Sequence, residues 1–550
     1  MRVLGINAVF HDPAAALVVD GQIVAAAEEE RFSRRKHGKP NVPFAAWELP
    51  ELSARWCLQR AGLSPEDLDA VAYSFDPSLC LSADQMPLDD PWDHLRVEYA
   101  RRAPAFLASA LPGLDPDRVR FVAHHVAHAA SAALAGPYRT SASLVLDGRG
   151  ERASHLAAHY VDGRLEPLAA QSLPSSLGLL YEDLTAHLGF HRSSDEYKVM
   201  ALASYGTPRH LDEFRELVRT TGDGGFVTEK VDWDAYAPPG SGELTSAHAD
   251  LAATVQTRLE QVVLELATWV HERTGEKHLT MAGGTALNCV ANSVVLRDGP
   301  FDDIWVQPAA GDAGTALGAA LHVAQSGGEL GEPMVLASLG RGFSDADLER
   351  ALRTARVGFE RPADLVGVVA DALARHQVVA WFQGRSEYGP RALGYRSLLA
   401  HPGRRENLAL LNDIKGREQF RPVAPLVLLE RAHELFDGKV PSPYMLFVHR
   451  VRDPWLERIP AVVHVDGTAR AQTVDRTTQP LLASLLDAFC ERTGLPVLVN
   501  TSLNTAGRPM VDSPQDALEL FGSAPVDLLV LGPFVVRRAD VAAVRTEVNA

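Results

Sequence analysis

A repeated pattern of short apolar strands constrains the fold of this chain more than any other feature. The first copy spans residues 3–28 and the second spans residues 142–170. Each copy reads as strand, turn, strand, hairpin and strand, and the hairpin turns are Asp20-Gly21 and Asp162-Gly163. A polar residue ends the first strand of each copy. A chance pair of hairpins is the alternative, but the matching order predicts an internal duplication.

Two glycine-rich turns follow the second copy, and each lies between an expected strand and an expected helix. A long helix is predicted over residues 246–274, then a strand over 277–281 and the turn Gly283-Gly284-Thr-Ala-Leu-Asn288. A strand over 304–308 leads to the second turn, which contains Gly311 and Asp312. Such turns let a backbone approach a ligand, and helix N-termini offer N–H groups to phosphate. Together with the duplicated strands, they indicate an actin-like nucleotide fold of the sugar-kinase and Hsp70 kind.

Two histidines in an alanine-rich segment form a candidate for half of a metal site. His124 and His128 lie four residues apart in a stretch, residues 121–134, that contains neither proline nor glycine. On a helix this spacing puts both imidazoles on one face, and it favours His124 over His125 as a ligand. Two neutral imidazoles can bind a divalent metal if carboxylates arrive from elsewhere. The simpler alternative is an alanine-rich helix with histidines at its polar end.

The size and charge of the chain limit the classes of function. At 550 residues it is too long for one core, so two or three domains are expected. A net charge of −17 argues against a protein that binds nucleic acid or an anionic membrane by bulk charge. With no apparent leader and no long apolar run, we expect an unexported, cytoplasmic protein. Four separated cysteines without a CxxC motif are typical of buried thiols in a reducing compartment.

The sequence changes in character after residue 335, where a second α/β domain is predicted to begin. Ser344 is expected to cap a short helix that runs to Ala355. Further elements follow: helices over 364–376, 481–492 and 513–522, and strands over 377–382, 495–500 and 526–531. Helices over 45–61, 93–111 and 195–206 are predicted in the first domain.

Basic residues gather in this second domain although the chain as a whole is acidic. Arginine matches phosphate geometry with two parallel N–H donors, so a phosphate-rich ligand is favoured over a network of salt bridges. Small polar groups after the strand over 495–500 can position a nucleotide or can form an ordinary turn. The candidate residues are Arg385, Arg391 and Arg396 in one segment, Lys415, Arg417 and Arg421 in the next, and Ser502 and Asn504 after the strand.

Seven motifs occur in the order found in the O-carbamoyltransferases of antibiotic and nodulation-factor biosynthesis, and the chain resembles that family over nearly its whole length. No single glycine turn is as specific as this ordered set. The motifs are Glu28–Gly38, the HHxxHA block that starts at His124, Glu196-Tyr-Lys198-Val-Met, Gly283–Asn288, Gly389–Gly394, Lys415–Pro422 and Asn500–Asn504.

The resemblance implies a division of labour between residues 1–335 and residues 336–550. The first domain is similar to the threonylcarbamoyl transferases of tRNA modification, and the second to YrdC-like domains. The second domain is then expected to make carbamoyl adenylate from carbamoyl phosphate and ATP with Mg²⁺. The first is expected to transfer the carbamoyl group to a hydroxyl of a small specialised metabolite, of the antibiotic type. A homodimer is an expectation at the family level only, and neither nucleic acid nor membrane is an expected partner.

The resemblance also assigns roles to individual residues. Iron(II) is the usual ion of the family, and its ligands here would be His124, His128, Asp147 and Asp312. His11 matches a position near the transferred group, either as a base for the acceptor hydroxyl or as a donor to the developing oxyanion. Lys36 and Asp195 complete the expected catalytic residues. The expected cofactor-binding residues are Glu196, Lys198, Gly283, Gly284, Asn288 and Gly311, together with the basic and polar residues of the second domain named above.

Some positions depart from the family pattern, and two other functions remain as alternatives. Ala201 and Ser204 stand where many relatives carry Gly and Pro, Tyr395 where Asn is common, and Arg508 where Glu is common, so the identity of the acceptor is in doubt. One alternative is an enzyme that threonylcarbamoylates tRNA, which the acidic balance argues against. The other is a non-catalytic, nucleotide-dependent switch or chaperone on the actin-like fold, which leaves the metal residues unexplained.

Overall fold

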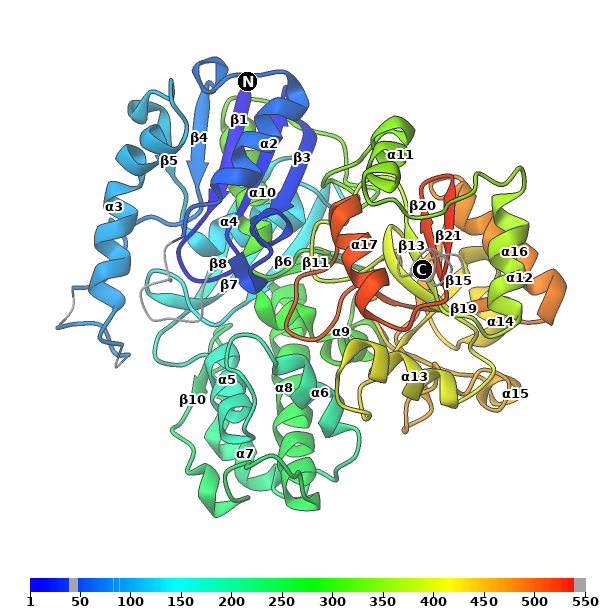
Figure 1. The fold of residues 1–550 in the computed structure, drawn as a ribbon. Coiled ribbons are helices and arrows are strands. Elements are labelled where there is room, and N and C mark those ends of the chain that lie inside the picture. The colour runs from blue at the N-terminus through cyan, green and yellow to red at the C-terminus, as the bar shows by residue number, and fades with distance from the viewer. Residues whose placement is uncertain (39–47, 83, 89, 539–550) are drawn as a thin grey trace. The chain divides into compact units, whose positions relative to one another are not determined.

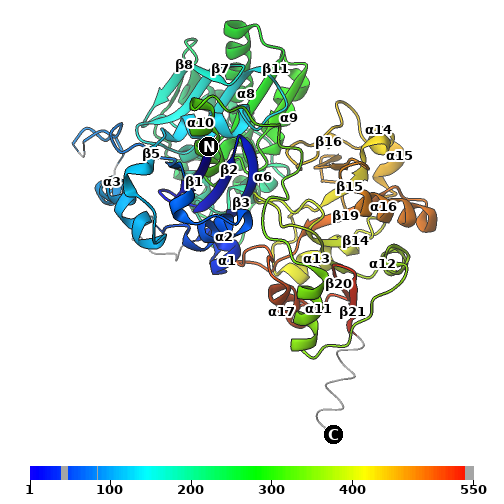
Figure 2. The same cartoon turned by 90° about the horizontal axis from the view of Figure 1, so that it is seen from above.

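The computed structural model describes residues 1–38, 48–82, 84–88 and 90–538. The chain divides into two compact units, Met1–Val335 and Leu336–Ala550, which are coloured blue to green and yellow-green to red in Figures 1 and 2. Each unit has its own sheets and its own apolar core. Among the described residues, no helix combines the length and apolarity that crossing a membrane requires.

Two five-stranded sheets with the same topology form the N-terminal unit. Their strand orders are β3-β2-β1-β4-β5 and β8-β7-β6-β11-β12. In each sheet the first three strands of the chain pair antiparallel, and the last two run parallel to the first. The predicted duplication is therefore confirmed, and this repeated order is that of the actin-like fold. The strands are β1 (Arg2–Asn7), β2 (Ala14–Val19), β3 (Gln22–Glu28), β4 (Ala70–Tyr73), β5 (Val119–Phe121), β6 (Thr140–Leu146), β7 (Ala153–Val161), β8 (Arg164–Ser172), β11 (His278–Ala282) and β12 (Asp303–Val306).

Two helices lie between these sheets, and their small residues allow a close approach. Helix α10 (Ala313–Ser326) packs on β1 and β2, helix α4 (His124–Ala133) packs on β6, β7 and β11, and the two helices contact each other (Figure 1). A Cβ added to Gly318 would lie 1.8 Å from the carbonyl oxygen of Ala127. Only glycine fits there, so the sequence of α10 fixes how near its N-terminus comes to the histidines of α4.

The remaining elements of the N-terminal unit surround this core. Helix α8 (Ser246–Thr274) has the predicted bounds and ends at Gly275, which adopts a left-handed conformation with φ of 69°. The others are α1 (Glu30–Ser33), α2 (Glu51–Ala61), α3 (Asp93–Ala110), α5 (Leu177–His187), α6 (Glu196–Ala203), α7 (Leu211–Leu217), α9 (Cys289–Asp298) and the hairpin of β9 (Val218–Thr220) and β10 (Phe226–Thr228).

The C-terminal unit is built on one mixed sheet of seven strands in the order β18-β15-β19-β14-β13-β20-β21. Helices α12 and α16 pack side by side, and buried Trp381, Phe382 and Phe489 belong to the core beneath them. The strands are β13 (Val379–Phe382), β14 (Arg396–Ala400), β15 (Ala424–Leu428), β18 (Gln472–Val474), β19 (Val497–Ser502), β20 (Leu528–Leu531) and β21 (Phe534–Arg537), with β16 (His449–Arg450) and β17 (Thr468–Ala469) as a separate pair. The helices are α11 (Asp345–Thr354), α12 (Leu365–Ala374), α13 (Glu406–Lys415), α14 (Ala432–Leu435), α15 (Asp453–Leu456), α16 (Pro480–Thr493) and α17 (Pro514–Ser523).

Several predicted boundaries are corrected by the structure. The helix predicted from residue 45 begins at Glu51, and residues 45–47 lie outside the described ranges. Helix α6 ends at Ala203, before Gly206, and α17 includes Gly522 because a single glycine is tolerated near a helix end. The strand predicted to be last is followed by β21, which turns back at Gly532 with a φ of 59°. Strand β14 is an addition to the predicted elements, and all five of its residues are buried although it begins with an arginine.

Candidate functional site

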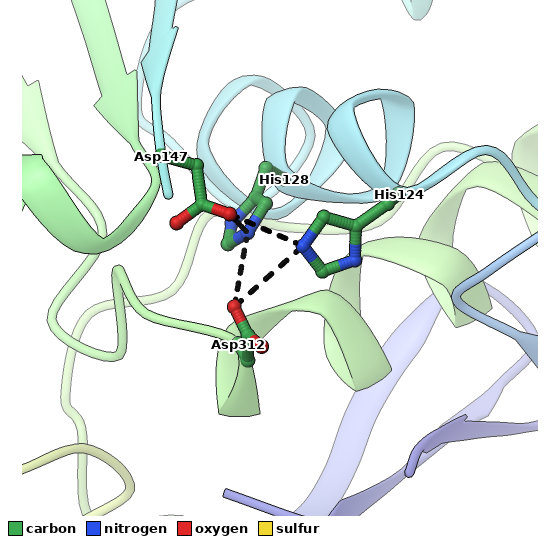
Figure 3. Close-up of side chains that lie close together, drawn as sticks. All are labelled: His124, His128, Asp147 and Asp312. Atoms are coloured by element: carbon green, nitrogen blue, oxygen red, sulfur yellow. Dashed lines mark ion pairs between the residues drawn. The ribbon is translucent and has the colours of Figure 1, made fainter. Parts of the chain in front are cut away.

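Two histidines and two aspartates converge between the sheets of the N-terminal unit (Figure 3). His124 Nε2 lies 3.4 Å from Asp147 Oδ2 and 3.6 Å from Asp312 Oδ1. His128 Nε2 lies 3.8 Å and 3.6 Å from the same two oxygens. All four side chains are buried. The residues come from α4, the end of β6 and the residue before α10, so the fold gathers ligand types that are far apart in the sequence.

Local hydrogen bonds orient these side chains toward one point. His124 Nδ1 donates to the carbonyl oxygen of Ser74 at 3.2 Å, and this contact directs Nε2 at the aspartates. The N–H of Gly284 donates to Asp147 Oδ1 at 2.8 Å, so Oδ2 of that carboxylate faces the histidines. Both ligand orientations are thus set by neighbouring backbone groups.

The four residues fit a divalent metal ion. Within the described ranges, His124 Nε2, both ring nitrogens of His128 and Asp312 Oδ2 are buried and have no hydrogen-bond partner. Each such atom costs about 1–3 kcal/mol when it is left unsatisfied. An ion bound tetrahedrally at about 2.1 Å holds its ligand atoms about 3.4 Å apart, close to the separations given above. An ion at this point would take one ligand atom from each of the four residues.

The charges in the cluster keep the two carboxylates in the ionised form that binds a metal. Burial acts to raise the pKa of Asp312, but the charge of His11 and the nearby imidazoles of His124 and His128 hold that pKa well below 3.8. Burial also acts to raise the pKa of Asp147, and its hydrogen bond to His124 helps to lower it. Both carboxylates are therefore ionised at neutral pH. His125 lies outside this group, and burial lowers the pKa of its imidazole to about 3.

His11 lies beside the four-residue cluster. Its Nε2 is 3.9 Å from Asp312 Oδ2, and its Nδ1 is hydrogen-bonded to Asp12 Oδ2 at 3.0 Å. Burial acts to lower the pKa of His11, but Asp312 and Asp12 outweigh it and raise the pKa to about 10. Asn7 Nδ2 donates to the carbonyl oxygens of His11 and Asp12 and so fixes this turn. Of the three residues expected to be catalytic, His11 is the one that reaches the cluster directly.

Lys36 and Asp195 lie in the same region but contact other groups. Lys36 Nζ donates to Ser194 Oγ at 3.3 Å. Asp195 is buried, and its Oδ2 forms an ion pair with Lys198 Nζ at 3.0 Å. Asp195 and Lys198, both expected site residues, therefore contact each other. Glu196 accepts the N–H of Ser193 at 2.7 Å, and burial with the charge of Glu182 raises its pKa to about 7.

The glycine turns of the N-terminal unit lie next to the two carboxylates in the sequence or in space. Gly283 has a φ of 92°, and an added Cβ would lie 2.2 Å from the carbonyl oxygen of Leu146. Asn288 caps α9 by accepting the N–H of Ala291 at 3.1 Å, and its Nδ2 donates to Gln256 Oε1 at 2.8 Å. Gly311 precedes Asp312, and a Cβ there would meet only Leu287 at 3.8 Å. A ligand could approach the backbone at Gly311 more readily than at Gly283.

A buried lysine marks a second polar site, in the C-terminal unit. Lys415 Nζ lies 2.5 Å from Ser502 O, 3.1 Å from Ser502 Oγ, 2.9 Å from Asn504 O and 2.7 Å from Asn504 Oδ1. Burial, followed by the charges of Arg417 and Arg421, holds the pKa of this ammonium well below 10.5. The last residue of α13 and the end of β19 are thereby joined, and three of the residues expected to bind a nucleotide meet at one point.

The arginines of this unit form hydrogen bonds and ion pairs with other groups of the protein, which the sequence did not indicate. Arg396 is fully buried, stands 3.6 Å from the ring centre of Phe382, and donates to the carbonyl oxygens of Gln383 and Arg341. Its terminal nitrogens donate to main-chain carbonyls, and binding of phosphate by Arg396 stays a prediction. The other expected arginines also have internal partners: Arg385 donates to Gly340 O, Arg417 to Asn412 Oδ1, Arg421 pairs with Glu418, and Arg391 is half-buried with contacts of its own.

Comparison with known proteins decides the family. The family model described as "Carbamoyltransferase N-terminus" matches residues 2–80 and 92–321, and "Carbamoyltransferase C-terminus" matches residues 370–538. The chain belongs to the carbamoyltransferase family. The resemblance inferred from the seven motifs is therefore confirmed, and the chain is a carbamoyltransferase-family enzyme.

Full-length relatives agree with this assignment. The carbamoyltransferase chain is 39% identical to "Nodulation protein NolNO" of Sinorhizobium fredii, over 97% of this chain and 80% of that protein. It is 37% identical to "Uncharacterized protein sll1178" of Synechocystis, over 98% and 97%. It is 30% identical to "Nodulation protein U" of Sinorhizobium fredii, over 94% and 96%.

Solved structures resemble the chain only weakly. Component A of the (R)-2-hydroxyglutaryl-CoA dehydratase of Acidaminococcus fermentans matches 60% of this chain and 99% of its own, with 15% identity and a TM-score of 0.34. Sua5 of P. abyssi matches 29% of this chain and 44% of its own, with 15% identity and a TM-score of 0.22. The actin-like assignment therefore rests on the repeated strand order.

Some residues of the carbamoyltransferase site carried no signal in the sequence. Glu151 is buried, and its Oε1 accepts the N–H of His124 and the N–H of Asp76, each at 2.8 Å, at the start of α4. His37 and Ser194 lie inside or beside quoted motifs, but their contact joins segments more than 150 residues apart, and only the fold brings them together. Asp12, Glu30 and His37 also bring potential ligand atoms together, although hydrogen bonds among these residues already occupy several of them.

Proposed function

We propose that this protein is an ATP-dependent O-carbamoyltransferase that acts on a hydroxyl group of a specialised metabolite of the antibiotic type. The main support is that the chain matches both the N-terminal and the C-terminal carbamoyltransferase models, and that each unit contains a buried polar site. The C-terminal unit, as a YrdC-like domain, makes carbamoyl adenylate, and the N-terminal unit transfers the carbamoyl group. Carbamoyl phosphate, ATP and water are consumed, and phosphate and pyrophosphate are released with the adenylate.

Lys415 supplies the cation for the first half-reaction. Its ammonium is held by Ser502 and Asn504 on one side, and burial strengthens its attraction to phosphoryl oxygens. Phosphoryl transfer depends mainly on positioning and on neutralising charge, which a fixed lysine and Mg²⁺ bound with ATP provide. The low pKa of free Lys415 would rise when an anionic substrate binds, because the opposite charge favours the ammonium.

His11 is the group best placed to act on the acceptor in the second half-reaction. Its hydrogen bond to Asp12 through Nδ1 directs Nε2 toward Asp312 and the four-residue cluster. As a neutral imidazole it takes the proton of the acceptor hydroxyl, and as an imidazolium it donates to the developing oxyanion. A divalent ion held by His124, His128, Asp147 and Asp312, which we propose to be iron(II), would polarise a carbonyl or phosphate oxygen of the donor.

The proposal is tested by incubating the protein with carbamoyl phosphate, ATP and Mg²⁺ in the absence of an acceptor. Pyrophosphate release and a mass-spectrometric signal for carbamoyl adenylate are expected. Folded protein that yields neither product would overturn the proposal. A gel-shift experiment with tRNA separates it from tRNA threonylcarbamoylation, because a chain with a net charge of −17 should not retard tRNA.

A further inference from the structure

A serine, a histidine and an aspartate form a line of hydrogen bonds beside the four-residue cluster. Ser194 Oγ lies 2.8 Å from His37 Nε2, and His37 Nδ1 lies 2.9 Å from Asp12 Oδ1. The three side chains come from the turn after β1, the segment after α1 and the residues before α6. A nucleophile, a base within hydrogen-bonding distance and a carboxylate that orients the base are the geometric signature of an activated serine, whatever the fold.

The surroundings of Ser194 suit a nucleophile better than a structural hydroxyl. Lys36 Nζ lies 3.3 Å from Ser194 Oγ, so a cation stands where an alkoxide or an oxyanion would develop. Asp12 uses its other oxygen to bind His11, and His11 reaches Asp312 at 3.9 Å. Ser194 is thereby connected through three side chains to the cluster at which transfer is proposed. Ser194 is half-buried, so a substrate can reach it.

Backbone strain is concentrated at the same place. Asp12, His37 and Ser193 have φ values of 49°, 60° and 57°, in the left-handed region that disfavours residues other than glycine. Such conformations persist where surrounding contacts impose them, and they gather at active sites. Here Glu30 Oε2 accepts the N–H of His37 at 2.8 Å, and Glu196 Oε1 accepts the N–H of Ser193 at 2.7 Å. The left-handed conformations are those of Asp12 and His37, which belong to the line of hydrogen bonds, and of Ser193, which precedes Ser194.

We propose that Ser194 is a catalytic nucleophile that carries the carbamoyl group between carbamoyl adenylate and the acceptor, with His37 as its base and Asp12 as the residue that orients His37. The inference rests on the proposed function, which supplies the adenylate. It adds a covalent step on the protein to the direct attack of the acceptor hydroxyl.

The chemistry balances in two displacements. In the first, Ser194 Oγ forms a bond to the carbamoyl carbon, His37 Nε2 takes the hydroxyl proton, and the bond between that carbon and the phosphate oxygen of AMP breaks. AMP leaves as the anion. Before the second displacement, the proton on His37 Nε2 passes to solvent. The acceptor oxygen then bonds to the carbamoyl carbon and gives its proton to His37 Nε2, the bond between that carbon and Ser194 Oγ breaks, and Oγ takes the proton from His37. Nothing is oxidised or reduced, and no further reactant is needed.

The covalent step is tested by quenching the wild-type protein with acid after incubation with carbamoyl phosphate, ATP and Mg²⁺ but no acceptor. We expect intact protein heavier by one carbamoyl group, with the modification mapped to Ser194. Ser194→Ala should release pyrophosphate and carry no modification. Ser193→Ala is the matched control, because the Ser193 hydroxyl binds Glu182 instead of His37, and it should be modified as the wild type is. Pyrophosphate release without a modified serine overturns the inference and leaves the proposed function standing.

A second experiment does not depend on the adenylate. p-Nitrophenyl carbamate mixed with the protein should give a burst of p-nitrophenol equal to the amount of protein, followed by slow release. The burst should be lost in Ser194→Ala, slowed at least 100-fold in His37→Gln, which keeps a hydrogen bond but no base, and kept in Ser193→Ala. A burst of equal size in Ser194→Ala, or no burst from folded wild type, contradicts the assignment, whatever happens to the pyrophosphate reaction.

Discussion

Gly284 donates its backbone N–H to Asp147 Oδ1 at 2.8 Å across 137 residues of chain, and this single bond decides which oxygen of the carboxylate faces the histidines. The glycine turn predicted to receive a phosphate therefore orients a carboxylate of the four-residue cluster. Asp147 follows β6 and Gly284 follows β11, the strand paired beside it, so the bond depends on the parallel register of the second sheet. The fold thus couples strand pairing to the orientation of a ligand.

Asp147→Asn should leave the protein folded but poor in metal. The amide oxygen can still accept from Gly284, whereas the negative charge that faces the two histidines is lost. Metal affinity should fall by more than about 10-fold, since the loss of even a supporting partner of a ligand typically costs that much. Metal content after dialysis measures it. Asp162→Asn, at an exposed hairpin, is the control and should keep its metal.

Removing the metal should destabilise the N-terminal unit. A ligand present at 100 times its Kd stabilises the fold by about 2.7 kcal/mol, and chelation removes that contribution. A chelator should therefore lower the unfolding temperature of the wild type, and it should not lower that of His128→Gln. Equal decreases in both proteins would mean that the chelator acts elsewhere.

Ser502→Ala should weaken adenylate formation and spare the metal. The change removes one oxygen from the group that holds Lys415, and a hydrogen bond to a charged group is worth about 1.5–3 kcal/mol. The rate of pyrophosphate release should fall about 10- to 100-fold. If metal content fell together with pyrophosphate release, the separation into two sites would be wrong. Ser484→Ala, on the exposed face of α16, is a suitable control.

Glu196→Gln should stabilise the protein at alkaline pH and leave it unchanged in acid. Burial first, and then the charge of Glu182, raise the pKa of Glu196 from 4.5 to about 7. The fold therefore favours the protonated form, so the contribution of this carboxyl is fully present below pH 4.5 and is lost as the pH rises through 7. The shift corresponds to at most about 3 kcal/mol. Unfolding temperatures at pH 5 and pH 8.5 should differ between the two proteins only at pH 8.5.

The parts of the account that were predictable from sequence depend on local patterns. Periodicity gave the bounds of α8, and the turn dipeptides Asp20-Gly21 and Asp162-Gly163 revealed the duplication. The spacing of His124 and His128 placed them on one helix face, and the structure brings both to Asp147 and Asp312. Those signals need only a few neighbouring residues.

The parts that were missed depend on contacts between distant segments. Glu151 accepts a hydrogen bond from the first residue of α4, and Ser194 is hydrogen-bonded to His37. Neither contact can be predicted from the residue type and its neighbours in the sequence. The burial of Arg396 was not predictable because charge in a sequence does not reveal burial, and the structure surrounds its guanidinium with carbonyl oxygens. Strand β21 was missed because it follows its partner after a two-residue turn at the end of the predicted sheet.

The central claim is that one chain makes carbamoyl adenylate in one unit and consumes it in the other. The most direct test measures pyrophosphate and carbamoyl adenylate together in three proteins given carbamoyl phosphate, ATP and Mg²⁺: wild type, Asp147→Asn and Lys415→Met. We predict pyrophosphate and detectable adenylate from the wild type and from Asp147→Asn, and neither product from Lys415→Met. Pyrophosphate from Lys415→Met at the wild-type rate, or its complete loss in Asp147→Asn, would contradict the account.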